Sequence, residues 1–317
     1  MIPAAFRVSA PELTGDAGPW REPAAFIDLA GEENDVPHIR LPACPVIGVG
    51  ARGHPLAHRL DTVIESHRDV GAVSKAIVDQ PLAAAVVTQL LRQLPALPPE
   101  QGLTAESMAY AVLQGSAGHR AWIAAQPRRE VLPEGEVRLS RQDGELTVTL
   151  DRPGAGNAID RPMRDGLHEA FALANADETI TRVVLRAEGK AFSLGAELSE
   201  FGTTTDPATA HRIRCLTLPA REAVHCAGRL EARIDGACVG AGLELAAYAR
   251  RITATPRSWF QLPELAMGIL PGAGGCVSLT RRVGRQRALL LILSGRRINA
   301  RQALAWGLVD ALVDKLA

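Results

Sequence analysis

The fold of this chain is decided by one stretch, Asp235-Gly236-Ala237-Cys238-Val239-Gly240-Ala241-Gly242-Leu243-Glu244-Leu245-Ala246. It is typical of a short strand, a turn of small residues and the start of a helix. Small residues at such a turn let a ligand approach the backbone N–H groups, and the helix N-terminus adds positive potential there. Glu244 lies within this apolar stretch, and a buried carboxylate is unfavourable unless its charge or its proton is used.

Two further segments have the same character. Leu262-Pro263-Glu264-Leu265-Ala266-Met267-Gly268 carries a second glutamate on a glycine-containing turn, and Gly189 to Leu198 forms another such turn after an expected strand. Two glycine turns that face each other can supply two N–H donors to one developing oxyanion. Glu244 and Glu264 are therefore interpreted as a paired acid and base beside an oxyanion hole.

These segments belong to six ordered blocks that resemble the enoyl-CoA hydratase/isomerase (crotonase) superfamily over residues 137–313. The blocks are Leu150-Asp151-Arg152-Pro153 with Asn157-Ala158; Gly189-Lys190-Ala191-Phe192-Ser193-Leu194-Gly195-Ala196-Glu197-Leu198; Gly240 to Ala246; Phe260 with Pro263-Glu264; Gly268 with Pro271-Gly272-Ala273-Gly274-Gly275; and Ser294-Gly295-Arg296 through Ala303 to Gly307-Leu308-Val309.

The resemblance implies roles for individual residues. The backbone N–H groups of Ala196 and Ala241 would form the oxyanion hole for an acyl-CoA thioester, and Glu244 and Glu264 would be the two catalytic glutamates. Gly272 would lie on a turn that helps to hold the catalytic water. Contacts to coenzyme A, as part of the substrate, are expected at Lys190, Ala191, Phe192 and Leu194. Ala241 and Glu197 depart mildly from the family pattern, and no other cofactor and no metal is expected.

The leading functional hypothesis is syn hydration of a 2-enoyl-CoA. Glu244 would orient and deprotonate water for attack at Cβ, and Glu264 would deliver a proton to Cα. Isomerisation by one glutamate is the closest rival, and a cofactor-independent oxygenase of the same superfamily is a further one. From a different class, the chain would be a non-catalytic crotonase-like module that binds an acyl-CoA or a partner enzyme.

The expected fold is α/β, with a crotonase-like ββα spiral core in residues 131–317 and a small α/β-helical extension in residues 1–130. Family members usually continue beyond Gly-Leu-Val in helices that build a trimer, whereas Asp310 to Ala317 alone follow here. We expect the extension to substitute for those helices or to form a lid, and a homo-oligomer, trimer or hexamer, is expected.

Periodicity and turn residues predict the individual elements. Asp143-Gly144 between two alternating runs, 137–140 and 146–150, predicts a hairpin. Pro95 to Gly102 is expected to be a break. Strands are predicted at Ala25–Leu29, Cys44–Gly50, Thr62–Glu65 and Arg182–Arg186, and helices at Val70–Asp79, Leu82–Leu94, Thr104–Leu113, His119–Ala125 and Met163–Asn175.

Composition limits the function classes. The 35 basic and 35 acidic residues cancel, so no overall field attracts nucleic acid or an anionic membrane, and neither is an expected partner. Five dispersed cysteines favour reduced thiols. Because the sequence shows no secretory signal pattern and no long apolar run, a cytoplasmic location is expected.

Two further motifs are given less weight. The Gly48-x-Gly50-x-x-Gly53 pattern lacks room for a dinucleotide-binding crossover helix. Seven arginines between Arg281 and Arg301 are interpreted either as a solvated helix face or as contacts to CoA phosphates or another subunit.

Overall fold

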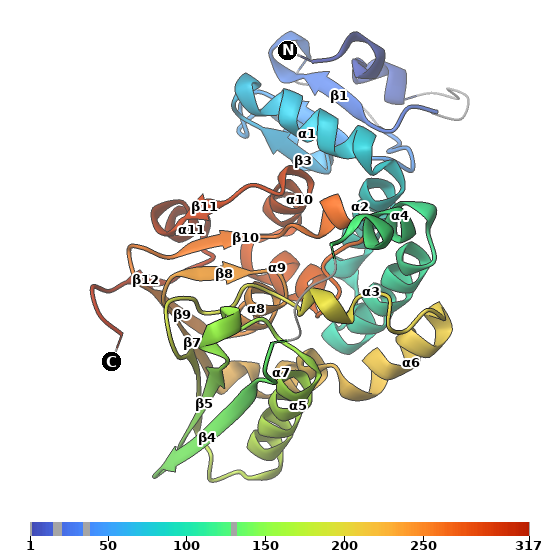
Figure 1. Ribbon diagram of the computed structural model, residues 1–317. Helices are drawn as coiled ribbons and strands as arrows, with labels where there is room; N and C mark the ends of the chain where they lie inside the picture. Colours follow the sequence, from blue (N-terminus) through green and yellow to red (C-terminus); the bar gives the residue numbers. More distant parts are fainter. Residues whose placement is uncertain (1, 15–20, 34–38, 128–131, 317) are drawn as a thin grey trace.

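A computed structural model describes residues 2–14, 21–33, 39–127 and 132–316 (Figure 1). The fold is mixed α/β, as predicted, and the predicted strands and helices are present within a few residues of their expected ends. One boundary differs clearly. α3 (Pro99–Gln114) begins five residues before the predicted Thr104, inside the expected break, because proline is well accommodated at the first position of a helix.

The N-terminal extension begins with a parallel sheet in the order β1 (Ala25–Asp28), β2 (Val46–Val49) and β3 (Thr62–Ile64). Four helices follow: α1 (His67–Asp79), α2 (Pro81–Gln93), α3 and α4 (Ala117–Ala125). In Figure 1 the sheet and α1 lie at the top, and α2 to α4 run down the right side of the C-terminal part. The predicted division between residues 130 and 131 falls outside the described residues.

The C-terminal part contains two sheets among the described residues. The larger has the order β12-β9-β7-β6-β5-β4, parallel except for the predicted hairpin of β4 and β5, where Asp143 has a positive φ of 51°. The smaller has the order β11-β10-β8. Their strands are β4 (Glu136–Gln142), β5 (Glu145–Asp151), β6 (Arg182–Ala187), β7 (Leu230–Ile234), β8 (Ala237–Val239), β9 (Arg251–Ala254), β10 (Trp259–Gln261), β11 (Ile298–Asn299) and β12 (Ala311–Leu312).

The helices of the C-terminal part are α5 (Arg161–Ala176), α6 (Pro207–Thr217), α7 (Pro219–Cys226), α8 (Ala241–Ala246), α9 (Gly275–Val283), α10 (Arg285–Ser294) and α11 (Ala300–Trp306). Among them, α6 packs against α3 of the extension (Figure 1). No single helix in the described ranges is long and apolar enough to cross a membrane, although the bent pair of α1 with Pro81–Ala96 passes the same test of length and composition.

One hydrophobic core runs through both parts of the chain. Leu103 and Leu113 of α3 belong to the same buried cluster as Leu243 of α8 and Val277 of α9. At Gly102 the two parts approach so closely that a Cβ would lie 3.1 Å from Cγ2 of Val277. The extension therefore packs onto the C-terminal part as a layer of the same structure.

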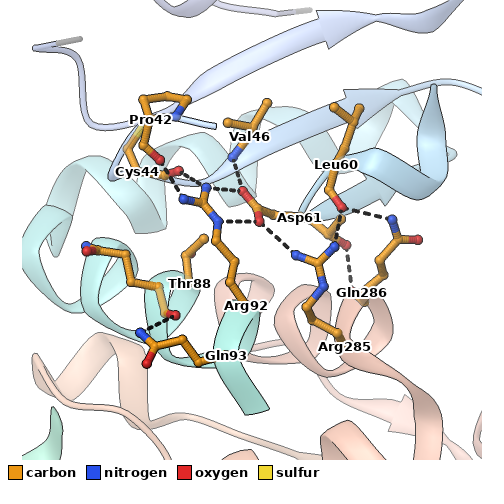
Figure 2. A network of polar contacts seen from close by, with 12 residues as sticks. Pro42, Cys44, Val46, Leu60, Asp61, Thr88, Arg92, Gln93, Arg285 and Gln286 are labelled. Carbon is orange, nitrogen blue, oxygen red and sulfur yellow. Dashed lines mark hydrogen bonds and ion pairs between the residues drawn. The ribbon is translucent and has the colours of Figure 1, made fainter. Parts of the chain in front are cut away.

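A buried polar network joins the same two parts above α10 (Figure 2). The carboxylate of Asp61, which is fully buried, accepts hydrogen bonds from Arg92 at 2.6 Å and from Arg285 at 3.0 Å. Arg281 donates to the carbonyl of Leu97. Arg296 of the C-terminal part forms an ion pair with Asp69. Three of the seven clustered arginines thus bind the extension, a role that neither interpretation of the cluster anticipated.

Candidate active site

Two glycine turns lie side by side at the ends of the strand segments that carry them. The N–H of Ser193 donates to the carbonyl of Ala237, and the N–H of Val239 donates back to the carbonyl of Ser193. A Cβ on Gly240 would come 3.5 Å from Cα of Gly195. Both glycines have positive φ, 99° at Gly195 and 47° at Gly240, which a residue with a Cβ rarely adopts. Glycine is therefore needed at both turns for this close approach.

Ala196 and Ala241, the residues that follow these glycines, each present an N–H group. Ala241 is the first residue of α8, so its N–H has no partner within the helix. Ala196 bridges Ile159, but that bridge uses the N–H groups of Ile159 and Glu197. Within the described part of the chain, neither alanine N–H donates a hydrogen bond. Two neighbouring turns thus carry two N–H donors that a ligand can use.

Glu244 points from α8 toward the start of α9. Its Oε2 accepts hydrogen bonds from the N–H of Ala273 at 2.7 Å and of Gly275 at 2.9 Å, and the residue is 2% exposed. Burial raises the pKa of Glu244 from 4.5 to about 7, and the two N–H groups oppose that rise. Near neutral pH this carboxylate can therefore accept or hold a proton.

Glu264 stands at the start of the short 3-10 helix Glu264–Met267, and its side chain lies against the turn at Gly240. A Cβ on Gly240 would meet Oε1 of Glu264 at 2.6 Å, which places this carboxyl group directly at the glycine turn. Its Oε2 is buried and, among the described residues, has no hydrogen-bond partner. Burial, and then the charge of Glu244, raise the pKa of Glu264 well above its ordinary value. The raised pKa favours the protonated form of Glu264.

The structure adds two residues of the extension to this site, both on one face of α3. The ring of Tyr110 lies against Gly272, and both oxygens of Glu106 accept backbone N–H groups from Gly274 and Val277. Sequence reasoning missed both residues because it treated residues 1–130 as a separate unit. The signal was present: Glu106 is the one charged residue between Leu103 and Leu113 in the predicted helix, one turn before Tyr110.

The four residues expected at coenzyme A have different surroundings. Lys190 is exposed, and Leu194 is 49% exposed. The side chain of Phe192 is buried in the core at 1% exposure, so it is not accessible to coenzyme A. The carbonyl of Ala191 accepts a hydrogen bond from the side-chain amide of Asn157, which holds the turn in place. In the described ranges, no group of three or more His, Cys, Asp or Glu side chains is arranged to hold a metal ion.

The family model described as enoyl-CoA hydratase/isomerase matches residues 140–316. Among curated proteins, the 2,3-dehydroadipyl-CoA hydratase of Escherichia coli is 36% identical over 175 residues, which cover 55% of this chain and 68% of the relative. The mevalonyl-coenzyme A hydratase SIDH of Beauveria bassiana is 35% identical over 176 residues, 53% of this chain and 63% of the relative. The chain thus spans about two thirds of the length of these relatives.

Solved structures give the same result. The enoyl-CoA hydratase of Mycobacterium smegmatis superposes with a TM-score of 0.51 at 31% identity, covering 57% of this chain and 70% of that one. The enoyl-CoA hydratase of Thermoplasma volcanium gives a TM-score of 0.50 at 34% identity, covering 56% and 72%. The match includes every block on which the two glycine turns and the two glutamates lie. The chain therefore belongs to the enoyl-CoA hydratase/isomerase family of the crotonase superfamily.

Proposed function

We propose that this protein is an enoyl-CoA hydratase that adds water to a 2-enoyl-CoA thioester. One observation carries the proposal: two buried carboxyl groups at one site have opposite hydrogen-bonding environments. Glu244 accepts two backbone N–H groups at one oxygen, whereas Oε2 of Glu264 has no partner in the described part of the chain. Paired groups with separated proton affinities are the usual arrangement for a base and an acid that act together.

The two glycine turns would activate the substrate. In this proposal the thioester oxygen accepts hydrogen bonds from the N–H groups of Ala196 and Ala241. Those donors withdraw electron density from the conjugated system, so Cβ becomes electrophilic and negative charge can accumulate on the thioester oxygen. Each donor of an oxyanion hole is typically worth about 2.7–4 kcal/mol in the transition state.

The two glutamates would then move the protons. The Glu244 carboxylate takes a proton from water as the water oxygen bonds to Cβ, and the π electrons move to the thioester oxygen as an enolate. When the enolate collapses, Cα takes the proton of Glu264. The sum of the two steps is addition of one H and one OH across the double bond. Afterwards Glu244 is protonated and Glu264 is charged, so one proton must pass between them, directly or through water, before the next turnover.

A basic hollow beside the Lys190 turn supports binding of the phosphates of coenzyme A. Its volume is about 570 Å³, and its cationic lining residues are Arg186, Arg233, Arg257 and Lys315. Two acidic residues, Asp235 and Asp314, also line the hollow, and Asp235 forms an ion pair with Arg257. A Cβ on Gly236, the residue after Asp235, would lie 2.1 Å from the carbonyl oxygen of Lys190. Arginine and lysine are the side chains best suited to phosphate oxygens.

The test is the loss of enoyl absorbance with crotonyl-CoA and with a longer 2-enoyl-CoA. Wild type is expected to turn over, and Glu244→Gln and Glu264→Gln are each expected to lower kcat by about 10²- to 10⁴-fold, the usual contribution of general acid–base catalysis. The exposed Glu169 on α5 offers a matched control, and Glu169→Gln should retain wild-type kcat. Normal turnover by either glutamine variant would refute the two-carboxylate mechanism.

Isomerisation is the nearest rival, and one relative at 29% identity is named as a trans-2-decenoyl-[acyl-carrier-protein] isomerase, of Streptococcus mutans. Isomerisation needs one shuttling carboxylate, so the presence of two at this site favours hydration. Product analysis by mass separates the two reactions, because hydration adds 18 Da and isomerisation adds nothing. Consumption of oxygen would indicate the oxygenase alternative, and binding of an acyl-CoA without turnover would indicate a non-catalytic module.

A further inference from the structure

We propose that Glu106, contributed by the N-terminal extension, is a positioning residue that holds the Ala273–Val277 backbone in the conformation that binds Glu244. The inference rests on the proposed function for its kinetic consequence, but its structural content is independent of it. Glu106 lies 168 residues from Gly274 in the chain, and the helix that carries it precedes the segment matched by the family model.

The hydrogen bonds of this segment alternate between two carboxylates. The N–H groups of Ala273 and Gly275 donate to Glu244, at 2.7 and 2.9 Å. The intervening N–H of Gly274 donates to Oε1 of Glu106 at 2.7 Å, and the N–H of Val277 donates to Oε2 at 3.2 Å. Each carboxyl group thus accepts hydrogen bonds from two of the N–H groups at the start of α9, which have no partner within the helix. Moving one carboxylate changes the peptide planes that the other one binds.

Packing leaves Glu106 little freedom to move. The residue is 1% exposed, and α3 approaches α9 closely at Gly102 and Val277. Arg214 of α6 donates to Oγ of Ser107, the residue after Glu106, at 3.0 Å. Its Cζ also lies 4.5 Å from the ring centroid of Tyr110, one helical turn further on. The carbonyl of Gly274 also accepts a hydrogen bond from the Tyr248 hydroxyl at 2.8 Å. The segment is therefore fixed from the α3 side and from the α8 side together.

A buried carboxylate would be a poor choice for a purely structural contact. Burial, and then the charge of Glu244, raise the pKa of Glu106 well above its ordinary value, so this group destabilises the fold when it is ionised beside Glu244. An apolar residue of similar volume would avoid that cost. What Glu106 adds is two acceptors aimed at the segment that orients Glu244.

The first test is Glu106→Gln, because glutamine keeps the shape but can accept at one atom only. We expect kcat to fall by about 10²-fold, the effect of misplacing a catalytic group by about 1 Å, with KM within about threefold of wild type. Amide hydrogen exchange gives a readout that needs no turnover. The amides of Ala273 and Gly275 should exchange at least about tenfold faster in the variant, as after loss of one hydrogen bond, while those of α5 stay unchanged.

Two control variants separate positioning from general destabilisation. Glu100→Gln removes an exposed carboxylate from the first turn of the same helix and should behave as wild type. Thr88→Val removes a fully buried hydroxyl that bonds within α2, so it lowers the melting temperature without touching the site. If Glu106→Gln fails to fold, Glu106→Asp takes its place, because it keeps the carboxyl group and withdraws it from both N–H groups.

The outcomes distinguish this inference from the proposed function. A wild-type kcat together with wild-type exchange at Ala273 and Gly275 in the Glu106 variant overturns the positioning role. A loss of kcat that Thr88→Val reproduces at equal melting temperature overturns it as well. If the wild-type protein hydrates no 2-enoyl-CoA, the proposed function fails, and exchange at residues 273 and 275 alone decides the role of Glu106.

Discussion

The ring of Tyr110 lies so close to the backbone of Gly272 that a Cβ at residue 272 would come 2.1 Å from Cδ2 of the tyrosine. A helix of the extension therefore packs directly against the turn at Gly272, which the resemblance predicts to help hold the catalytic water. Burial, together with the charges of Glu244 and Glu264, raises the pKa of the Tyr110 hydroxyl, so at neutral pH this side chain is uncharged.

Gly272→Ala is expected to destabilise the protein by about 1–3 kcal/mol, because the new methyl group must displace a packed aromatic ring. Urea denaturation measures the loss. Gly31→Ala is the control, since no atom lies within 4 Å of a Cβ at that position. In the double variant with Tyr110→Ala most of the effect of Gly272→Ala should vanish, and additivity of the two changes would show that the ring does not limit residue 272.

Asp61→Asn is expected to lower the free energy of unfolding by about 3–5 kcal/mol. The substitution removes the one buried carboxylate that both Arg92 and Arg285 contact, and it leaves two partly buried cations without that partner. Denaturation followed by circular dichroism should show one shifted transition, because the larger of two buried clusters contains residues of both the extension and the C-terminal part. Asp79→Asn, which breaks an exposed pair with Lys75, should change stability by less than about 1 kcal/mol.

Gly240→Ala is expected to abolish activity and to destabilise the fold by at least about 1–3 kcal/mol. The positive φ of 47° strains any residue with a Cβ, and that Cβ would lie 2.6 Å from Oε1 of Glu264. Enoyl-CoA turnover and thermal denaturation measure the two effects. Gly228→Ala is the matched control, with no atom within 4 Å of its Cβ. An active Gly240→Ala variant would contradict the proposed contact between the turn and the acid.

Stability should fall as the pH rises through the range in which the buried glutamates ionise. Folding raises the pKa of Glu244 from 4.5 to about 7, so the stability that its protonated form provides is complete below pH 4.5 and is lost as the pH approaches 7. That single shift corresponds to about 3 kcal/mol. Glu264 shifts in the same direction.

Glu264→Gln should therefore melt at a higher temperature than wild type at pH 8 and at nearly the same temperature at pH 5. Melting curves of both proteins across this range provide the measurement. Glu169→Gln, on an exposed face, should follow wild type at every pH. A variant that is less stable than wild type at pH 8 would mean that Glu264 is ionised and well solvated in the folded protein.

The rate of hydration should also depend on pH, with a fall below about pH 7. Under the proposed mechanism Glu244 must be ionised to accept a proton from water, and its pKa is raised to about 7. A second fall is expected at higher pH, where Glu264 loses the proton that it must donate. Profiles of kcat/KM against pH report the two values of the coupled pair. A flat profile from pH 5 to 8 would exclude Glu244 as the base.

The parts of the fold that could be predicted from sequence are those set by neighbouring residues. The hairpin at Asp143-Gly144, the strand, turn and helix around Gly240, and the first helices of the extension follow from local periodicity and turn chemistry. The predicted start of α3 was wrong. Pro95, Pro98 and Pro99 indicate a break in the chain, but Pro99 is the first residue of the helix. The family could be identified because each of its motifs is a short contiguous stretch.

The sequence by itself determined the family, the α/β class and the positions of two glutamates on glycine-containing turns, because those properties depend on residues close together in the chain. Only the tertiary structure decided that the extension contributes Glu106 and Tyr110 to the same site and that Asp61 binds Arg285, 224 residues away. Contacts of that kind depend on how separate layers pack, and no local pattern encodes which buried carboxylate meets which backbone N–H group. The different hydrogen-bonding environments of Glu244 and Glu264 arise from that packing.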